Sequence, residues 1–103
     1  MKKSLAVLVL FALAIVPTAL AEDGAALFKA KCAMCHGQTG DGQTTMGKNM
    51  KLRDLGSADV QKQTDAELTK ITTDGKNKMP AYKGKLSDAE IAAVVKHIRS
   101  LKK

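Results

Sequence analysis

The stretch Cys32-Ala33-Met34-Cys35-His36 is the most informative motif in this chain of 103 residues. Two cysteines three positions apart, followed directly by a histidine, form the attachment pattern of c-type haem. The two thiols can add to the vinyl groups of one porphyrin, and the adjacent imidazole can bind its iron. On a helix, positions i, i+3 and i+4 share one face. We therefore expect Cys32, Cys35 and His36 to point toward one flat cofactor.

Other interpretations of the cysteine pair need features that the sequence does not supply. A disulfide or thioredoxin-like redox pair expects a βαβ context and has no use for the neighbouring histidine. A zinc site needs four ligands of the Cys, His or carboxylate type. Beyond the motif there is no third cysteine, and His97 is the one other histidine. A chance occurrence of the five-residue pattern is the remaining alternative.

From Gly24 to Leu101 the sequence resembles the small bacterial class I cytochromes c, and four stretches carry this resemblance. They are Ala26–Cys32, Cys35–Gly37, Lys78–Tyr82 and Ile91–Leu101. The resemblance implies an all-α cytochrome c fold, in which three main helices and loops wrap around one covalently attached haem. It also implies iron ligation by a histidine and a methionine, and transfer of single electrons between proteins.

Met79 is the expected sixth ligand of the iron, on the face opposite His36. It follows His36 at a distance that leaves enough chain to wrap around the porphyrin. Pro80 fixes φ and removes a backbone donor, which stiffens the segment that must hold a weak iron–sulfur bond. Met46 lies soon after His36 and is poorly placed to cross to the other face. Met50 and His97 are the further candidates.

The first 21 residues have the features of a secretory signal peptide. Lys2 and Lys3 give a positive start, Leu5 to Val16 is an apolar run, and Ala19-Leu20-Ala21 is a small-x-small cleavage site. The apolar run is shorter than the ~20 residues of a membrane-spanning helix. We expect cleavage after Ala21, export to the bacterial periplasm, and one cytochrome domain over residues 22–103.

The composition of the mature chain favours a core built around a cofactor. Once Phe11 leaves with the leader, Phe28 and Tyr82 are the only aromatic residues. A chain of this size buries a marginal core. A covalently held porphyrin supplies the large apolar body that the side chains do not.

The charge of the mature chain points to an acidic partner. Because the leader holds two of the 17 basic residues and none of the 10 acidic ones, the mature chain keeps a net charge of +5. Scarcity of aromatic residues and export both argue against nucleic acid. Lys76, Lys78, Lys83 and Lys85 surround Met79 in sequence, and we expect them to steer an acidic redox protein to the haem edge.

Local signals place the helices. Asp23, or the residue before it, can cap a first helix that runs to the cysteines, and Phe28 should meet the last helix. Capping boxes at Thr64-Asp65-Ala66-Glu67 and Ser87-Asp88-Ala89-Glu90 open two further helices. Residues 57–63 could form a short helix, residues 76–85 a lysine-rich loop, and residues 37–47 a glycine-rich loop.

The groups around the haem periphery are less well defined by sequence. Many relatives use a proline carbonyl after the motif to orient the proximal histidine, yet no proline lies between Pro17 and Pro80. Some other carbonyl must therefore orient His36. Candidates for binding a haem propionate are Arg53, Lys48 and Asn49.

These features predict a monomeric electron carrier with one haem c and no enzymatic activity. An iron held by a histidine and a thioether has no vacant position for a substrate. The alternative is a haem enzyme, or a gas-binding or sensing haem protein, whose sixth ligand is displaceable.

Overall fold

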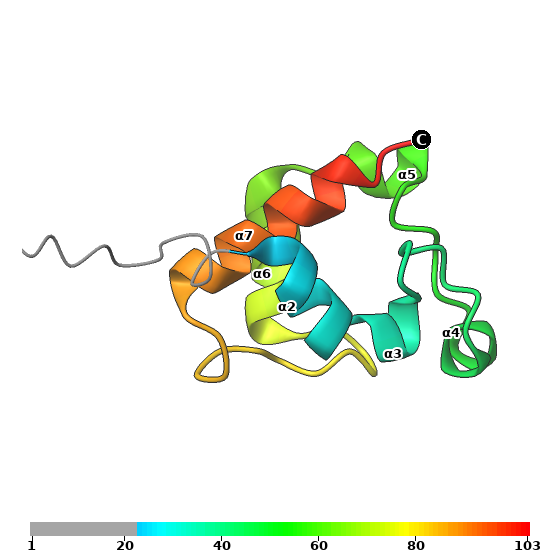
Figure 1. Cartoon of the computed structure of the whole chain (residues 1–103), viewed down its shortest axis with the longest axis horizontal. Helices are drawn as coiled ribbons and strands as arrows, with labels where there is room; N and C mark the ends of the chain where they lie inside the picture. Colours follow the sequence, from blue (N-terminus) through cyan, green and yellow to red (C-terminus); the bar gives the residue numbers. More distant parts are fainter. Residues whose placement is uncertain (1–22) are drawn as a thin grey trace, which may run out of the picture.

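The computed structural model describes residues 23–103, so the predicted signal peptide and its cleavage site lie outside the described residues. Six helices follow one another along this part of the chain (Figure 1). They are α2 (Gly24–Lys31), α3 (Ala33–His36), α4 (Thr45–Met50), α5 (Ala58–Gln61), α6 (Asp65–Asp74) and α7 (Asp88–Ser100). Over residues 23–103 the only β pairings are two isolated bridges. The three longest helices, α2, α6 and α7, confirm the predicted all-α architecture.

The helix starts follow from capping side chains that the sequence indicated. The Asp23 carboxylate accepts a hydrogen bond from the Ala26 N–H at 3.1 Å and begins α2. Thr64 and Ser87 form reciprocal capping boxes with Glu67 and Glu90 at the starts of α6 and α7. These three predictions are confirmed.

The first helix runs to the cysteines as predicted, and Cys32 both ends α2 and begins the separate turn α3. One local prediction differs from the structure. The predicted loop over residues 37–47 ends early, because the Thr44 hydroxyl caps a further helix, α4, by accepting the Gly47 N–H at 2.8 Å. The sequence of α4 is short and polar and contains a glycine, so it shows little helical periodicity. The Thr44 cap is the local feature that indicates where this helix begins.

The apolar core lies where α2 and α7 cross, with α6 packed beside them (Figure 1). Phe28 from α2 and Ile91 and Val94 from α7 are fully buried there, as the sequence predicted for Phe28. Gly24 allows the two helices to approach closely, since a Cβ at this position would collide with the Ala93 carbonyl of α7. The core is completed by Val60, Leu68, Leu86, Val95 and Ile98.

A network around Arg99 holds the turn before α6 against α7. The Arg99 guanidinium donates to the Gln61 carbonyl at 2.8 Å, to the Gln63 carbonyl at 2.5 Å and to the Asp65 carboxylate at 2.8 Å. At the chain end, the Lys103 N–H donates to the Gly56 carbonyl at 3.1 Å. Within residues 23–103, no helix is both long and apolar enough to cross a membrane.

Candidate functional site

Two adjoining cavities form one cleft beside the helix crossing. The inner cavity has a volume of about 240 Å³ and the outer one about 620 Å³. Side chains shared by both cavities join them, and we refer to the two together as the cleft. The shared residues are Cys32, His36, Leu52, Arg53, Lys76, Asn77 and Met79.

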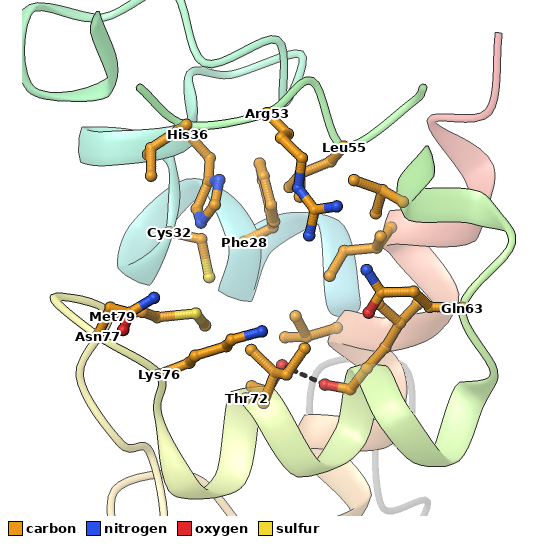
Figure 2. Close-up of a pocket in the computed structure, with 16 residues that line it drawn as sticks. Phe28, Cys32, His36, Arg53, Leu55, Gln63, Thr72, Lys76, Asn77 and Met79 are labelled. Atoms are coloured by element: carbon orange, nitrogen blue, oxygen red, sulfur yellow. Dashed lines mark hydrogen bonds between the residues drawn. The ribbon is translucent and has the colours of Figure 1, made fainter. Parts of the chain in front are cut away.

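The predicted axial ligands lie on opposite sides of this cleft. Figure 2 shows His36 of α3 on one side and Met79, from the segment between α6 and α7, on the other, with both side chains directed into the cavity. Cys32 points into the cleft from the same side as His36, and Cys35 lines the outer cavity. The structure therefore brings all four predicted site residues to one cleft.

The glycine-rich loop supports the attachment motif from behind. The Thr44 hydroxyl donates to the Cys35 carbonyl at 2.6 Å, and the Gly42 N–H donates to the His36 carbonyl at 2.7 Å. Gly47 leaves room for this packing, because a Cβ there would press on the carbonyls of Gly42 and Cys35. These contacts hold α3 in place through its backbone, and apart from the number of glycines no sequence pattern indicates them.

The electrostatic setting keeps the histidine in its metal-binding form. Burial lowers the pKa of His36, so the imidazole stays neutral at physiological pH and keeps a lone pair for a metal. Its Nδ1 is buried and has no hydrogen-bond partner. We predicted that a backbone carbonyl orients the His36 ring. Among residues 23–103, no carbonyl accepts a hydrogen bond from His36 Nδ1.

The cysteines do not form a disulfide or a multi-ligand metal cluster. Both are free thiols. Burial, and to a smaller extent the neighbouring Cys35, raise the pKa of Cys32 to about 11. Over residues 23–103, no group of three His, Cys, Asp or Glu side chains is arranged to hold a metal ion. A zinc site would need such a set of ligands.

The segment that carries Met79 is fixed at the end of α6. Gly75 ends that helix with a positive φ of 77°, and a Cβ there would lie 2.7 Å from the Met79 carbonyl. The Lys76 and Met79 backbones exchange hydrogen bonds of 3.2 and 2.9 Å. Asn77, between them, adopts the left-handed conformation that asparagine tolerates better than most residues. The loop that sequence reasoning described only as lysine-rich is therefore a tight, closed turn.

The other candidates separate into those at the cleft and those away from it. Arg53 and Asn49 line the cleft, whereas Lys48 does not. Met50 lines the outer cavity. Met46 is exposed and lines neither cavity, and His97 packs against Phe28 with ring centroids 5.0 Å apart. Cleft residues that the sequence analysis missed include Leu52, Leu55, Gln63 and Thr72, none of which belongs to a recognisable motif.

Lysines surround the outer cavity. They are Lys31, Lys51, Lys76 and Lys78. Two of the four lysines singled out by sequence, Lys83 and Lys85, do not line it, and the Lys85 ammonium instead lies 5.9 Å from the Tyr82 ring. Met34, between the two cysteines, is 77% exposed beside the same cavity.

This set of residues fits a c-type haem. The inner cavity has apolar walls formed by core side chains such as Phe28, Leu68 and Val94, which suit a porphyrin. The outer cavity carries the thiols, and its lysines and Arg53 can offset propionate charge. The neutral imidazole of His36 and the thioether of Met79 face each other across the cleft (Figure 2).

The sequence and fold have known counterparts. Residues 19–98 match the family model described as cytochrome C oxidase, cbb3-type, subunit III. Cytochrome c6 of Leptolyngbya boryana is 37% identical over 78 residues, which cover 76% of this chain and 88% of that protein. Cytochrome c6 of Rippkaea orientalis is 42% identical over 87 residues, which cover 82% of this chain and 75% of that protein. Among solved structures, the KustC0563 c-type cytochrome matches with a TM-score of 0.73 and 31% identity, over 79% of this chain and 99% of that one.

Proposed function

The chain belongs to the class I c-type cytochromes, and we propose that Cys32 and Cys35 carry its haem through thioether bonds while His36 and Met79 bind the iron. It carries one haem c, which supplies a one-electron Fe(II)/Fe(III) couple. The observation that carries the residue assignment is the opposition of His36 and Met79 across a cleft with Cys32 at its edge (Figure 2). The chain is an electron carrier rather than an enzyme, in keeping with relatives that are cytochromes c6 by name.

Each residue has a separate task in this function. The neutral His36 imidazole donates its lone pair to the metal, while hydrogen bonds to the Cys35 and His36 carbonyls hold α3 still. The Met79 thioether would bind the iron from the side of the cleft across from His36, which would leave no open site for a substrate. The soft, neutral sulfur favours the ferrous state, and we expect a reduction potential above that of a bis-histidine haem. This filled position disfavours the haem enzyme and gas-binding alternatives.

The test of the ligand assignment is absorption spectroscopy of the exported protein in both oxidation states. Met79→Ala should abolish the far-red sulfur-to-iron charge-transfer band and let cyanide bind rapidly. Met50→Leu is the matched control, because Met50 also lines the outer cavity and should leave the band in place. Loss of the band in Met50→Leu and its survival in Met79→Ala would reassign the ligand to Met50.

The physiological partners are redox proteins, and an acidic docking face on the partner fits the lysines around the outer cavity. Lys31, Lys51, Lys76 and Lys78 come from three segments of the chain and converge on that opening. Such a ring of charge raises the association rate with anions at low salt. Lys78→Gln should slow oxidation by ferricyanide and weaken its salt dependence, whereas Lys96→Gln, on α7 away from the cleft, should do neither. Equal effects of both variants would remove this face from consideration.

The cellular setting extends this proposal. Export to the periplasm, cleavage after Ala21 and a monomeric domain over residues 22–103 follow from the leader sequence and from the small size of the domain. The mass of the secreted protein tests the cleavage site, since a mass that begins at another residue contradicts it. Sedimentation of the holoprotein tests the monomer.

A further inference from the structure

A single hydrogen bond joins the two sides of the cleft through Tyr82. Its hydroxyl donates to the Lys31 carbonyl at 2.9 Å. Lys31 ends α2 and directly precedes Cys32, while Tyr82 lies three residues after Met79. Within residues 23–103, no other hydrogen bond connects residues 24–36 with residues 75–86.

The backbone around Tyr82 is itself anchored, so its side chain acts on a fixed point. The Tyr82 N–H donates to the Thr72 carbonyl of α6 at 3.0 Å. The Tyr82 carbonyl accepts from Lys85 and Leu86 at 2.9 and 3.0 Å. The ring is half-buried against the core cluster and lines the outer cavity. Tyr82 is therefore attached to α6 through its backbone and to the end of α2 through its hydroxyl.

Met79, by contrast, has few attachments of its own. Among residues 23–103, its backbone bonds only to Lys76, three positions earlier in the same turn. Pro80 and Ala81 are the two residues between Met79 and Tyr82, and the proline ring fixes φ in this short link. A displacement of Tyr82 is thus transmitted to Met79 with little slack.

We propose that Tyr82 is a positioning residue for the methionine ligand: its hydroxyl ties the Met79 segment to the attachment segment and holds the thioether on the iron. This inference rests on the proposed ligation by Met79. The thioether is a weak ligand, so an outside ligand binds only in the fraction of molecules in which the Met79 segment has moved away. Loss of the Tyr82 hydrogen bond increases that fraction without changing the ligands.

Tyr82→Phe isolates the hydroxyl, because the ring and its packing remain. Imidazole titrated into the ferric holoprotein competes with Met79 and reports the open fraction. The far-red charge-transfer band should persist in the variant, while the apparent affinity for imidazole should rise roughly twofold to tenfold, the range expected for one net hydrogen bond. An affinity equal to that of the wild type, with the band present in both proteins, overturns the role of Tyr82 and leaves the Met79 assignment standing.

Thr64→Ala is the matched control for general destabilisation. It removes the N-terminal cap of α6, at the end of that helix far from Met79, and weakens the whole domain by a comparable amount. Imidazole affinity should stay at the wild-type value in this variant. An equal rise in Thr64→Ala and Tyr82→Phe would show that imidazole reports overall stability and would overturn the proposal. Absence of the band in the wild type would overturn both the ligand assignment and the inference built on it.

Discussion

The helix crossing of α2 and α7 and the segments that border the cleft are stabilised in different ways. The crossing is built from apolar side chains in direct contact, with Phe28, Ile91 and Val94 fully buried. Residues 37–56, on the cleft, contribute no fully buried side chain to the apolar core, and only the partly buried Leu55 packs against it. They are held by backbone hydrogen bonds, by glycines that permit close approach and by the Thr44 hydroxyl.

This difference shows which part of the fold depends on the cofactor. Burial of apolar surface between α2 and α7 stabilises the helix crossing directly, at roughly 25 cal/mol per Å², although Phe28 and Val94 also line the inner cavity. The segments at residues 37–56 and 75–80 border a cavity instead of a packed interior. We therefore expect their order to depend on the haem far more than that of α2 and α7.

The largest expected effect comes from removing the covalent attachment. In Cys32→Ala/Cys35→Ala, acidified organic solvent should extract the haem, which it cannot do from the wild type. Amide hydrogens at residues 37–56 in the haem-free protein should exchange at least 100-fold faster than in the holoprotein. A bound group at 100 times its Kd already stabilises by ~2.7 kcal/mol. Exchange that accelerates equally in α2 and α7, measured by mass spectrometry, would erase the distinction between the two regions.

Truncation of a core side chain should be the next largest effect. Phe28→Ala removes a fully buried ring at the helix crossing and should lower the free energy of unfolding of the holoprotein by about 3–5 kcal/mol. Met34→Ala, an exposed apolar residue beside the cleft, should change it by less than ~0.5 kcal/mol. Denaturant unfolding measures both. Similar losses in the two variants would mean that the region near the motif is as tightly packed as the core.

A smaller effect, of opposite sign, is expected at the end of α4. Lys51 ends this helix with a φ of 56°, in the left-handed region that favours glycine. Lys51→Gly should raise the free energy of unfolding by about 0.5–1 kcal/mol, because it removes backbone strain on the cleft side. Lys62→Gly is the control at the end of α5, where φ is −76°, and should destabilise the protein. A loss of stability in both variants would show that Lys51 is unstrained.

The smallest expected effect is a dependence of stability on acid. The Asp54 carboxylate accepts from Lys103 at 2.6 Å and from the Gly56 N–H at 2.8 Å, and these hydrogen bonds lower the pKa of Asp54 from its usual 3.8. A lowered pKa gives a contribution that is present above 3.8 and is lost as the pH falls through the lower value. Asp54→Asn should therefore flatten the stability profile slightly below pH 4 in acid-unfolding curves. An unchanged profile would contradict the assignment to Asp54.

Much of the fold follows from local sequence signals. The caps at Asp23, Thr64 and Ser87 were identifiable because a side chain and a nearby backbone N–H suffice to define them. Helix α4 was missed since its cap, Thr44, stands in a glycine-rich stretch without an apolar stripe. Local patterns are informative when the partner is close in sequence.

The residues of the site also differ in how far the sequence predicts them. Cys32, Cys35 and His36 form a contiguous motif, and Met79 was selected by its position in the chain and by Pro80. By contrast, Leu52, Gln63 and Thr72 reach the cleft through tertiary packing. The bond from Tyr82 to Lys31 joins residues 51 positions apart, which no local pattern specifies.

The crossing of α2 with α7 also fixes the order in which the protein can be completed. Synthesis delivers α2 near the beginning of the described chain and α7 near its end, so α2 waits unpaired while the segments between them emerge. Contacts between residues this far apart in sequence form late in folding, because the entropic cost of closing the long loop between them opposes their formation. Cys32 and Cys35 directly follow α2, and they therefore remain open to attachment chemistry until the last helix arrives.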